Sequence, residues 1–223
     1  LINQVQEFPA DAKVATRAAG SQVINDLAKA MPLLISGSAD LHGSTKNYIK
    51  DVGDFSKEDH SGRNLLFGIR EHAMGAIVNG IGYYGIFRPS GATFAVFADY
   101  MRPSVRLSAL TNLPIFHIWT HDSVAVGEDG PTHQPIEQLT GLRAIPNLNV
   151  FRPADINETL ECWEASLNND KGPSAIILSR QKLKYISKYP DKNNRCLRGA
   201  YEINITSHDN KATIVASGSE VEL

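Results

Sequence analysis

The sequence has few cysteines, no long hydrophobic run and no excess of charge of either sign. Its two cysteines, Cys162 and Cys196, form no CxxC pair, which argues against a disulfide framework and favours a reduced compartment such as the cytoplasm. No stretch approaches the roughly 18 consecutive apolar residues that a membrane-spanning helix needs. The 22 basic and 24 acidic residues nearly cancel, so the composition points to neither a nucleic-acid nor an acidic-membrane partner.

Several sequence motifs are missing as well. Neither GxGxxG nor GxxxxGK[ST] occurs, so a dinucleotide or mononucleotide phosphate cradle is not indicated. The first residues lack the charged start and apolar run of a signal peptide. The sequence begins without Met and stops at "ASGSEVEL", and we therefore expect a fragment of a longer protein.

What is present is the pattern of an ordinary globular protein, with 42% hydrophobic and 21% charged residues in 223. Helical spacing of apolar residues alternates with short apolar runs, each bounded by turn formers. Asp11 is the expected N-cap of the first helix, and residues 43–63 read as a long exposed loop. We expect helices over 12–31, 70–85, 104–110 and 156–167, and strands within 33–38, 91–97, 113–120, 147–153 and 174–180.

Strands that alternate with helices predict an α/β fold: a doubly wound, mostly parallel sheet covered on both faces. Ligands of such sheets bind beyond the carboxyl ends of the strands. Asp40 follows the first expected strand, His121 and Asp122 follow another, and Arg180 follows the last. We therefore expect these polar residues to share one rim of the sheet.

The chain changes character after Arg180, where it becomes charged and poorly patterned. We expect one domain over residues 1–185, a linker over 186–210, and the beginning of a second domain over 211–223. The last segment has the pattern of a strand, a Gly/Ser turn and the start of a helix.

The loop between residues 120 and 133 is longer than a strand-to-helix connection requires, and long ordered loops are often functional. Its Gly, Asp and Pro residues are also those of an ordinary surface turn. Metal binding is a second interpretation, although the spacing matches no known metal motif. Recognition of a polar, phosphorylated substrate is a third. The side chains in question are His121, Asp122, Glu128, Asp129 and His133.

Two further stretches allow a structural and a functional interpretation. Glu71 opens a helix of small and apolar residues, where a carboxylate is favoured by the helix dipole. In an apolar pocket the same carboxylate would have a raised pKa and could share a proton with a basic ring nitrogen. Phe94, Phe97 and Tyr100 follow at a spacing of three, either as core residues or as a stacking wall for a flat heterocycle.

Taken together, "SGSADL", "FGIREHAMGAIVNGI", "GATFAVFADYMRPSVRLSAL", "THDSVAVGEDGPTHQPIEQL", "FRPAD" and "ILSRQ" closely resemble the pyrimidine-binding domain of transketolase. The resemblance runs from about Ala15 to Gln181, and the tail from about Lys211 resembles the start of the C-terminal domain of that family. Deoxyxylulose phosphate synthase and the beta subunits of 2-oxo acid dehydrogenases share the fold and the glutamate, but not "GEDGPTHQP".

The resemblance implies a cofactor, thiamine diphosphate, and residues that contact it. Glu71 matches the glutamate that hydrogen-bonds the aminopyrimidine and drives formation of the reactive ylide. Phe94 is expected to stack on that ring, with Phe97 and Tyr100 completing the pocket. Asp40 matches an aspartate near the cofactor and the dimer contact.

The resemblance also implies the substrate-binding residues. His133 matches a histidine beside the substrate carbonyl that handles protons or holds the intermediate. Asp129 is expected to accept a hydrogen bond from a substrate hydroxyl and to help select stereochemistry. Four residues would bind the phosphate group of sugar phosphates, two of them through guanidiniums. These are Arg17, Ser44, His121 and Arg180; Ser44 lies in "DLHGSTKN", where many relatives have "DLTPSN".

By the same resemblance, the whole enzyme transfers a two-carbon ketol unit from a ketose phosphate to an aldose phosphate, in the pentose phosphate pathway. In this family a separate N-terminal domain holds the diphosphate and its Mg²⁺ (or Ca²⁺) through a GDG…N motif, which this sequence lacks. The active site forms between the two subunits of a homodimer. We therefore expect this chain to hold half a site, with no metal ligand of its own, and to be catalytically silent alone.

Alternatives remain open at this point. A metal-dependent hydrolase could use His121, Asp129 and His133. A transketolase-like module could act only by pairing with a partner chain, without activity. A dihydroxyacetone synthase would carry the same motifs and use formaldehyde as its acceptor.

Overall fold

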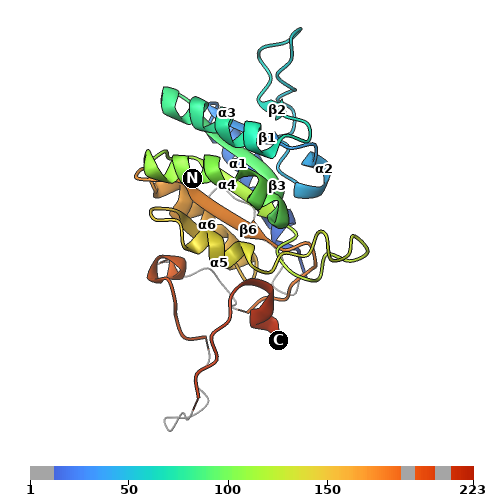
Figure 1. The fold of residues 1–223 in the computed structure, drawn as a ribbon, viewed down its shortest axis with the longest axis vertical. Coiled ribbons are helices and arrows are strands. Elements are labelled where there is room, and N and C mark those ends of the chain that lie inside the picture. Colours follow the sequence, from blue (N-terminus) through green and yellow to red (C-terminus); the bar gives the residue numbers. More distant parts are fainter. Residues whose placement is uncertain (1–12, 187–193, 204–211) are drawn as a thin grey trace.

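A six-stranded sheet forms the centre of the computed structural model, which describes residues 13–186, 194–203 and 212–223 (Figure 1). The strand order is β2-β1-β3-β4-β6-β5, and every neighbouring pair is parallel. The predicted doubly wound α/β class is confirmed. The strands are β1 (Leu34–Ser38), β2 (Asn64–Leu66), β3 (Arg88–Phe94), β4 (Phe116–Thr120), β5 (Asn149–Phe151) and β6 (Ser174–Leu178).

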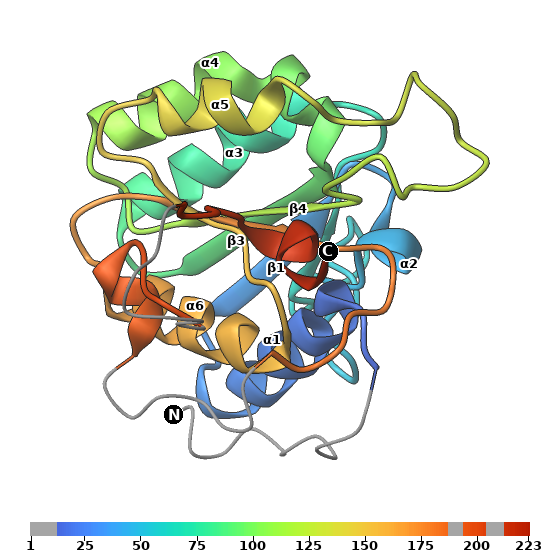
Figure 2. The ribbon, with the colours of Figure 1, turned by 90° about the horizontal axis from the view of Figure 1, so that it is seen from below.

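Helices cover both faces of this sheet (Figure 2). On one face lie α3 (Glu71–Tyr84), α4 (Ala98–Leu110) and α5 (Gln138–Arg143), and on the other lie α1 (Thr16–Ala30) and α6 (Ile156–Asn168). The short helix α2 (His42–Thr45) follows β1, and 3-10 helices span Ala95–Phe97 (η2), Arg195–Arg198 (η3) and Gly218–Glu222 (η4).

Each face of the sheet has its own hydrophobic core. All five residues of β4 are buried, and they alternate between the two faces as strand geometry requires. Phe116 and Ile118 pack in the core shared with α1 and α6, where Trp163 lies, whereas Trp119 packs in the core with α3 and α4. Strands buried on both faces explain why the apolar runs in this sequence are continuous.

Small residues let α3 pack closely on α4. A Cβ on Gly75 would lie only 2.8 Å from the Cβ of Ser104 in α4. Gly80 of the same helix makes no such close contact within the described residues, because a Cβ there would have no atom within 4 Å.

Two predicted helix boundaries are wrong. α1 begins at Thr16 and not directly after Asp11, because Val14 pairs with Leu183 in an antiparallel bridge; Asp11 itself lies outside the described residues. α4 begins at Ala98 and includes Pro103, although the sequence predicted a start after the proline. A proline costs a helix one hydrogen bond, and the burial of Met101 and Val105 on the inner side of α4 outweighs that cost.

Two further expectations need correction in detail. The strand predicted over 91–97 ends at Phe94, where η2 begins. The loop predicted over 43–63 is less exposed than expected, because Asn47 is buried and its side chain donates to the Ser36 Oγ at 2.8 Å and to the Gly37 carbonyl at 2.9 Å. The sequence did not predict β2, a three-residue strand directly after this loop.

Part of the predicted linker is ordered against α6. Asn194 donates to the Glu161 carbonyl at 2.8 Å, and Arg195 forms an ion pair with Glu161 at 3.0 Å. The free thiols of Cys162 and Cys196 lie with their sulfur atoms 3.4 Å apart. Residues 187–193 and 204–211 of the linker lie outside the described residues, and the domain boundaries remain a prediction.

The final segment differs from its sequence pattern. Residues 212–216 are exposed and form no strand in the described part of the chain. Residues 218–222 form the 3-10 helix η4 instead of an α-helix. No helix among the described residues combines the length and apolar character needed to cross a bilayer.

Candidate functional site

The carboxyl ends of the parallel strands bring the predicted polar residues to one rim of the sheet. β1 lies between β2 and β3, so the direction of chain progression reverses there, which is the usual position of a ligand site in such folds. Asp40 follows β1, His121 follows β4 and Arg180 follows β6. The predicted common rim is confirmed by this topology.

Two residues distant in the sequence hold the start of α1 against the end of β6. The Thr16 backbone N–H donates to the Ser179 Oγ at 3.0 Å, and the Ser179 N–H donates to the Thr16 Oγ1 at 2.7 Å. Arg17 and Arg180 are the next residues along each segment, so these bonds place both guanidiniums at the same corner of the rim.

Arg17 points from α1 toward β4. Its Nη1 donates to the Ser44 carbonyl at 2.7 Å and lies 3.4 Å from the His121 Nε2. Burial, followed by the nearby charge of Arg180, lowers the pKa of Arg17. Ser44 therefore contributes its backbone carbonyl to the site by orienting Arg17. Arg180 lies beneath Gly127, where a Cβ would meet the Arg180 Nη1 at 3.4 Å.

His121 is buried beside these guanidiniums in a left-handed backbone conformation, with φ of 59°. Its Nδ1 lies 2.9 Å from the Thr120 Oγ1, and its ring stacks on Phe94 with centroids 3.7 Å apart. Burial first, and then the charges of Arg17 and Arg180, lower its pKa to about 4. The imidazole is therefore neutral near pH 7 and provides hydrogen-bonding atoms instead of charge.

The three predicted aromatic residues form a connected row at the end of β3. Phe94 and Phe97 are parallel, with centroids 5.9 Å apart and planes 7° apart, and Tyr100 follows at 5.9 Å from Phe97. Phe94 is 7% exposed and is covered by His121, whereas Phe97 is half-buried and Tyr100 is 66% exposed. The accessible rings of the row are therefore Phe97 and Tyr100.

The two carboxylates predicted near a cofactor lie at the ends of regular elements. Glu71 is the first residue of α3 and is half-buried, and within the described residues its carboxylate has no hydrogen-bond partner. Asp40 is exposed and has φ of 63°, which allows the chain to turn sharply after β1.

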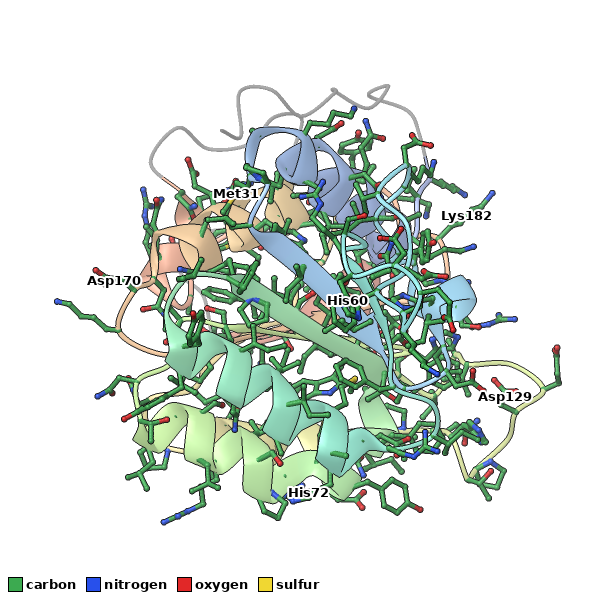
Figure 3. All side chains as sticks on the ribbon, turned by 90° about the horizontal axis from the view of Figure 1, so that it is seen from above. Met31, His60, His72, Asp129, Asp170 and Lys182 are labelled. Atoms are coloured by element: carbon green, nitrogen blue, oxygen red, sulfur yellow. The ribbon has the colours of Figure 1, made fainter. Side chains whose placement is uncertain are left out.

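The long loop after β4 carries Asp129 and His133 in different settings. Asp129 is exposed where the loop projects from the body of the molecule (Figure 3). His133 returns to the aromatic row, with its ring edge toward Phe97 at a centroid distance of 5.3 Å. Its Nδ1 lies 2.9 Å from the Thr132 Oγ1. Glu128 is exposed on the same loop.

Asp122 has a different role from the one its sequence position indicated. Its side chain is buried and forms an ion pair with Arg152, from the Nε to the Oδ2 at 2.9 Å. The sequence alone gave no signal for this pair, because 30 residues separate its members. Within the described part of the chain, no group of three or more His, Cys, Asp or Glu side chains is arranged to hold a metal ion. The site therefore gives the hydrolase interpretation no support.

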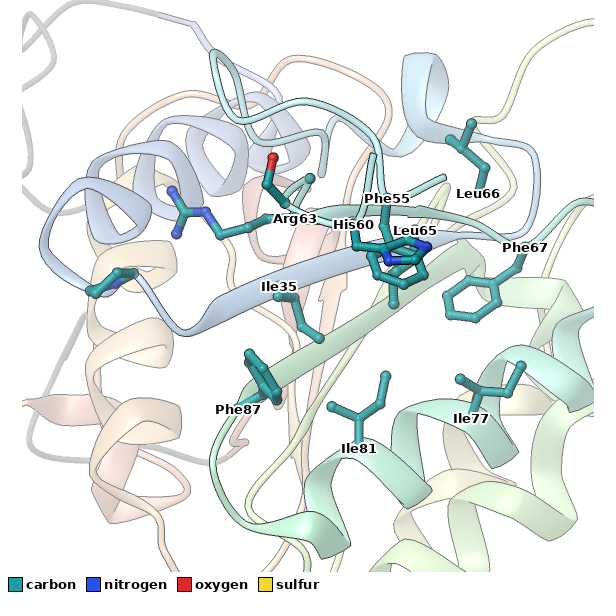
Figure 4. Close-up of a pocket in the computed structure, with 13 residues that line it drawn as sticks. Ile35, Phe55, His60, Arg63, Leu65, Leu66, Phe67, Ile77, Ile81 and Phe87 are labelled. Carbon is teal, nitrogen blue, oxygen red and sulfur yellow. The ribbon is translucent and has the colours of Figure 1, made fainter. Parts of the chain in front are cut away.

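An apolar hollow of about 590 Å³ lies elsewhere, between β1, α3 and the segment that leads into β2 (Figure 4). Ile35, Phe67, Ile77, Ile81 and Phe87 are among the residues that line it. None of the predicted site residues lines this hollow, so it is separate from the rim described above.

Comparison with known proteins decides the family. A family model described as "Transketolase, pyrimidine binding domain" matches residues 12–185. The chain belongs to this family. The transketolase domain covers both layers of helices and the whole rim, including Arg17 and Arg180.

The relatives that this chain matches are much longer proteins than the chain itself. A transketolase of Physarum polycephalum is 55% identical over 226 residues, which cover 100% of this chain and 34% of that protein. The crystal structure of a Pichia stipitis transketolase in complex with sedoheptulose 7-phosphate has a TM-score of 0.80 at 42% identity, covering 82% of this chain and 28% of the other. The chain thus spans about a third of the length of the curated relatives it matches.

A third relative comes from a split gene. The structure named "Split gene transketolase, inactive beta4 tetramer" has a TM-score of 0.64 at 30% identity, and the match covers 81% of this chain and 56% of that one. The matched region therefore makes up a larger share of that chain than of the Pichia stipitis transketolase, 56% against 28%.

Proposed function

We propose that the whole protein is a transketolase, which transfers a two-carbon ketol unit from a ketose phosphate to an aldose phosphate in the pentose phosphate pathway. The observation that carries the proposal is the cluster of Arg17, His121 and Arg180 at the carboxyl rim of the sheet. The similarity to named transketolases over the full length of the chain supports it.

The cluster suits the phosphate end of a sugar phosphate. Burial, and then the charge of Arg180, lowers the pKa of Arg17, so a dianionic group between the two guanidiniums would offset both effects. Guanidiniums bind phosphate oxygens in a fixed fork, and the neutral His121 adds a hydrogen-bonding nitrogen. The Ser44 carbonyl keeps Arg17 in position for this task.

The rim also fits the pyrimidine end of thiamine diphosphate. Glu71, a half-buried carboxylate with no partner among the described residues, would share a proton with a ring nitrogen, and Asp40 would lie nearby. Phe97 would present the stacking face in place of Phe94, because His121 already covers Phe94; Tyr100 would extend the wall. When bound, the cofactor supplies the carbon nucleophile for the ketose carbonyl.

Asp129 and His133 would contact the sugar itself. The exposed carboxylate of Asp129 would accept hydrogen bonds from a substrate hydroxyl and so contribute to stereochemical selection. His133 lies edge-on to the aromatic row, where its Nε2 would hold or move a proton at the carbonyl oxygen of the substrate.

The rest of the site would come from outside this chain. We assign binding of the diphosphate and its Mg²⁺ (or Ca²⁺) to another part of the whole protein. We also propose that the whole protein is a homodimer in the cytoplasm. The exposed apolar side chains Leu66, Ile69, Ile77, Tyr83 and Phe87 support a covering partner on the α3 side of the sheet. The name of the split-gene relative, an inactive tetramer, supports a chain that is silent alone.

Steady-state kinetics on the whole protein test this proposal. Ketol transfer from sedoheptulose 7-phosphate to an aldose phosphate is expected, and its absence would refute the activity. Arg180→Met should raise the KM for the phosphorylated donor by roughly 10- to 100-fold, the value of a charge-assisted hydrogen bond. The same variant should leave the KM for an unphosphorylated ketose within about twofold, since that donor lacks the phosphate. Equal effects on both donors would show that Arg180 does not bind the phosphate group of the substrate.

A further inference from the structure

Arg152, just beyond the end of β5, joins two parts of the chain that are distant in sequence. Its side chain is 8% exposed, and its Nε donates to the Asp122 Oδ2 at 2.9 Å. Its Nη2 lies 3.4 Å from the Asp122 carbonyl oxygen. One guanidinium thus contacts both the side chain and the backbone of the residue that follows His121.

The same guanidinium binds the C-terminal stretch on its other side. The Nη1 donates to the Ser217 carbonyl at 2.8 Å and pairs with the Glu220 carboxylate. The Nη2 lies 3.3 Å from the Ser219 Oγ. Within the described residues, Arg152 therefore connects the turn over residues 217–220, with which η4 begins, to Asp122.

Gly218 is required for this close approach. Its φ of 61° is one that residues with a side chain rarely adopt, and a Cβ there would lie 2.7 Å from both the Cγ and the Nε of Arg152. The backbone of the turn consequently lies directly on the arginine side chain. The C-terminal stretch therefore packs against residues that directly follow β4 and β5.

The position of Asp122 gives this interface a consequence for the site. His121 has a left-handed backbone, which is strained for a residue with a side chain, so its neighbours must hold it. Asp122 is the next residue, and Arg152 fixes its carboxylate and contacts its carbonyl.

We propose that Arg152 is a positioning residue through which seating of the Ser217–Glu220 turn holds His121 in its place on the rim. The inference rests on the proposed function in one respect, that His121 contacts the sugar phosphate. If the turn detached from Arg152, the backbone at residues 121–126 would loosen and sugar-phosphate binding would weaken. The chemistry at the substrate carbonyl would continue, because it uses other residues.

Two conservative variants of the whole protein test the proposal. Glu220→Gln removes the charge that faces Arg152, and Gly218→Ala pushes the turn away from it. Each should raise the KM for sedoheptulose 7-phosphate by about tenfold, with kcat within about twofold, the pattern expected when a binding contact is weakened. Glu222→Gln is the matched control, because Glu222 belongs to the same stretch but pairs with Lys184 at 2.7 Å. This control should leave KM unchanged.

Hydrogen–deuterium exchange of residues 121–126 in the same proteins separates this inference from the function itself. Faster exchange in Glu220→Gln and Gly218→Ala, but not in Glu222→Gln, is the expected result and does not depend on any activity. If the wild-type protein transferred no ketol unit, the proposed function would fail while this readout still reported the coupling. Unchanged exchange in both variants, or an equal effect of Glu222→Gln, would overturn the proposal.

Discussion

Two histidines four residues apart show how the site is built one residue at a time. His117 points into the core from β4, where its Nε2 lies 3.1 Å from the Ser108 Oγ and its ring stacks on Trp119. His121 lies just past the end of the same strand, beside two guanidiniums. Burial lowers the pKa of both to about 4, yet only His121 faces the rim.

His117 makes the stability of the domain dependent on pH. Because the native pKa of about 4 is below the ordinary value of 6.5, the unfolded chain binds a proton that the folded chain does not. The contribution of neutral His117 to stability is fully present above pH 6.5 and is lost as the pH falls toward 4, a loss of about 3 kcal/mol. In His117→Gln, chemical denaturation between pH 7 and pH 4 should show a smaller loss, since only His121 of the pair would still titrate. An identical loss in both proteins would contradict this account.

Glu71 offers the sharpest test of a catalytic assignment. In the whole protein, Glu71→Gln should lower kcat for ketol transfer by roughly 10²- to 10⁴-fold, because an amide cannot exchange a proton with the ring nitrogen. Glu128→Gln is a suitable control, since Glu128 is an exposed carboxylate to which the geometry gives no role. Near-normal turnover in Glu71→Gln, measured by steady-state kinetics, would remove Glu71 from the site.

Sequence motifs predicted which residue types would reach the rim, but not the pairs among them. Asp40, His121 and Arg180 follow apolar strands, a pattern that is visible without a structure. The pair of Asp122 with Arg152 depends on two strand ends meeting in space, and no local pattern encodes it. The covering of Phe94 by His121 likewise follows from strand order, and it leaves Phe97 as the more accessible ring.

At the scale of elements, the contact between α3 and α4 gives a matched pair of substitutions. Gly75→Ala would place a Cβ 2.8 Å from the Ser104 Cβ and should lower the free energy of unfolding by about 1–3 kcal/mol. Gly80→Ala meets no atom within 4 Å and should raise it by about 0.5–1 kcal/mol, the usual gain of alanine over glycine within a helix. Urea denaturation of the two variants measures both changes. A stabilising Gly75→Ala would contradict the packing described for this contact.

Elements with strong periodicity or continuous apolar runs could be predicted, and those fixed by tertiary contacts could not. α3, α6, β4 and β6 appear where the sequence placed them. β2 has three residues and exists because it pairs with β1, while α4 extends across Pro103 because its inner side is buried. Residues 212–216 have the apolar pattern of a strand, yet no described strand pairs with them.

At the scale of the whole molecule, the rim carries two guanidiniums beside His121 and a row of aromatic rings. The chain that carries them spans about a third of the length of its relatives. The exposed apolar residues on the α3 side lie around the hollow in Figure 4 and extend beyond it. We propose that this chain supplies the pyrimidine and sugar-phosphate half of a transketolase site and that another part of the protein supplies the rest.

The direct test is to measure ketol transfer from sedoheptulose 7-phosphate to an aldose phosphate, with thiamine diphosphate and Mg²⁺ present. The whole protein and the 223-residue chain are assayed side by side. The account predicts turnover by the whole protein and none by the chain alone at equal concentration. Turnover by the isolated chain at a rate comparable with the whole protein, or no transfer by the whole protein, would contradict it.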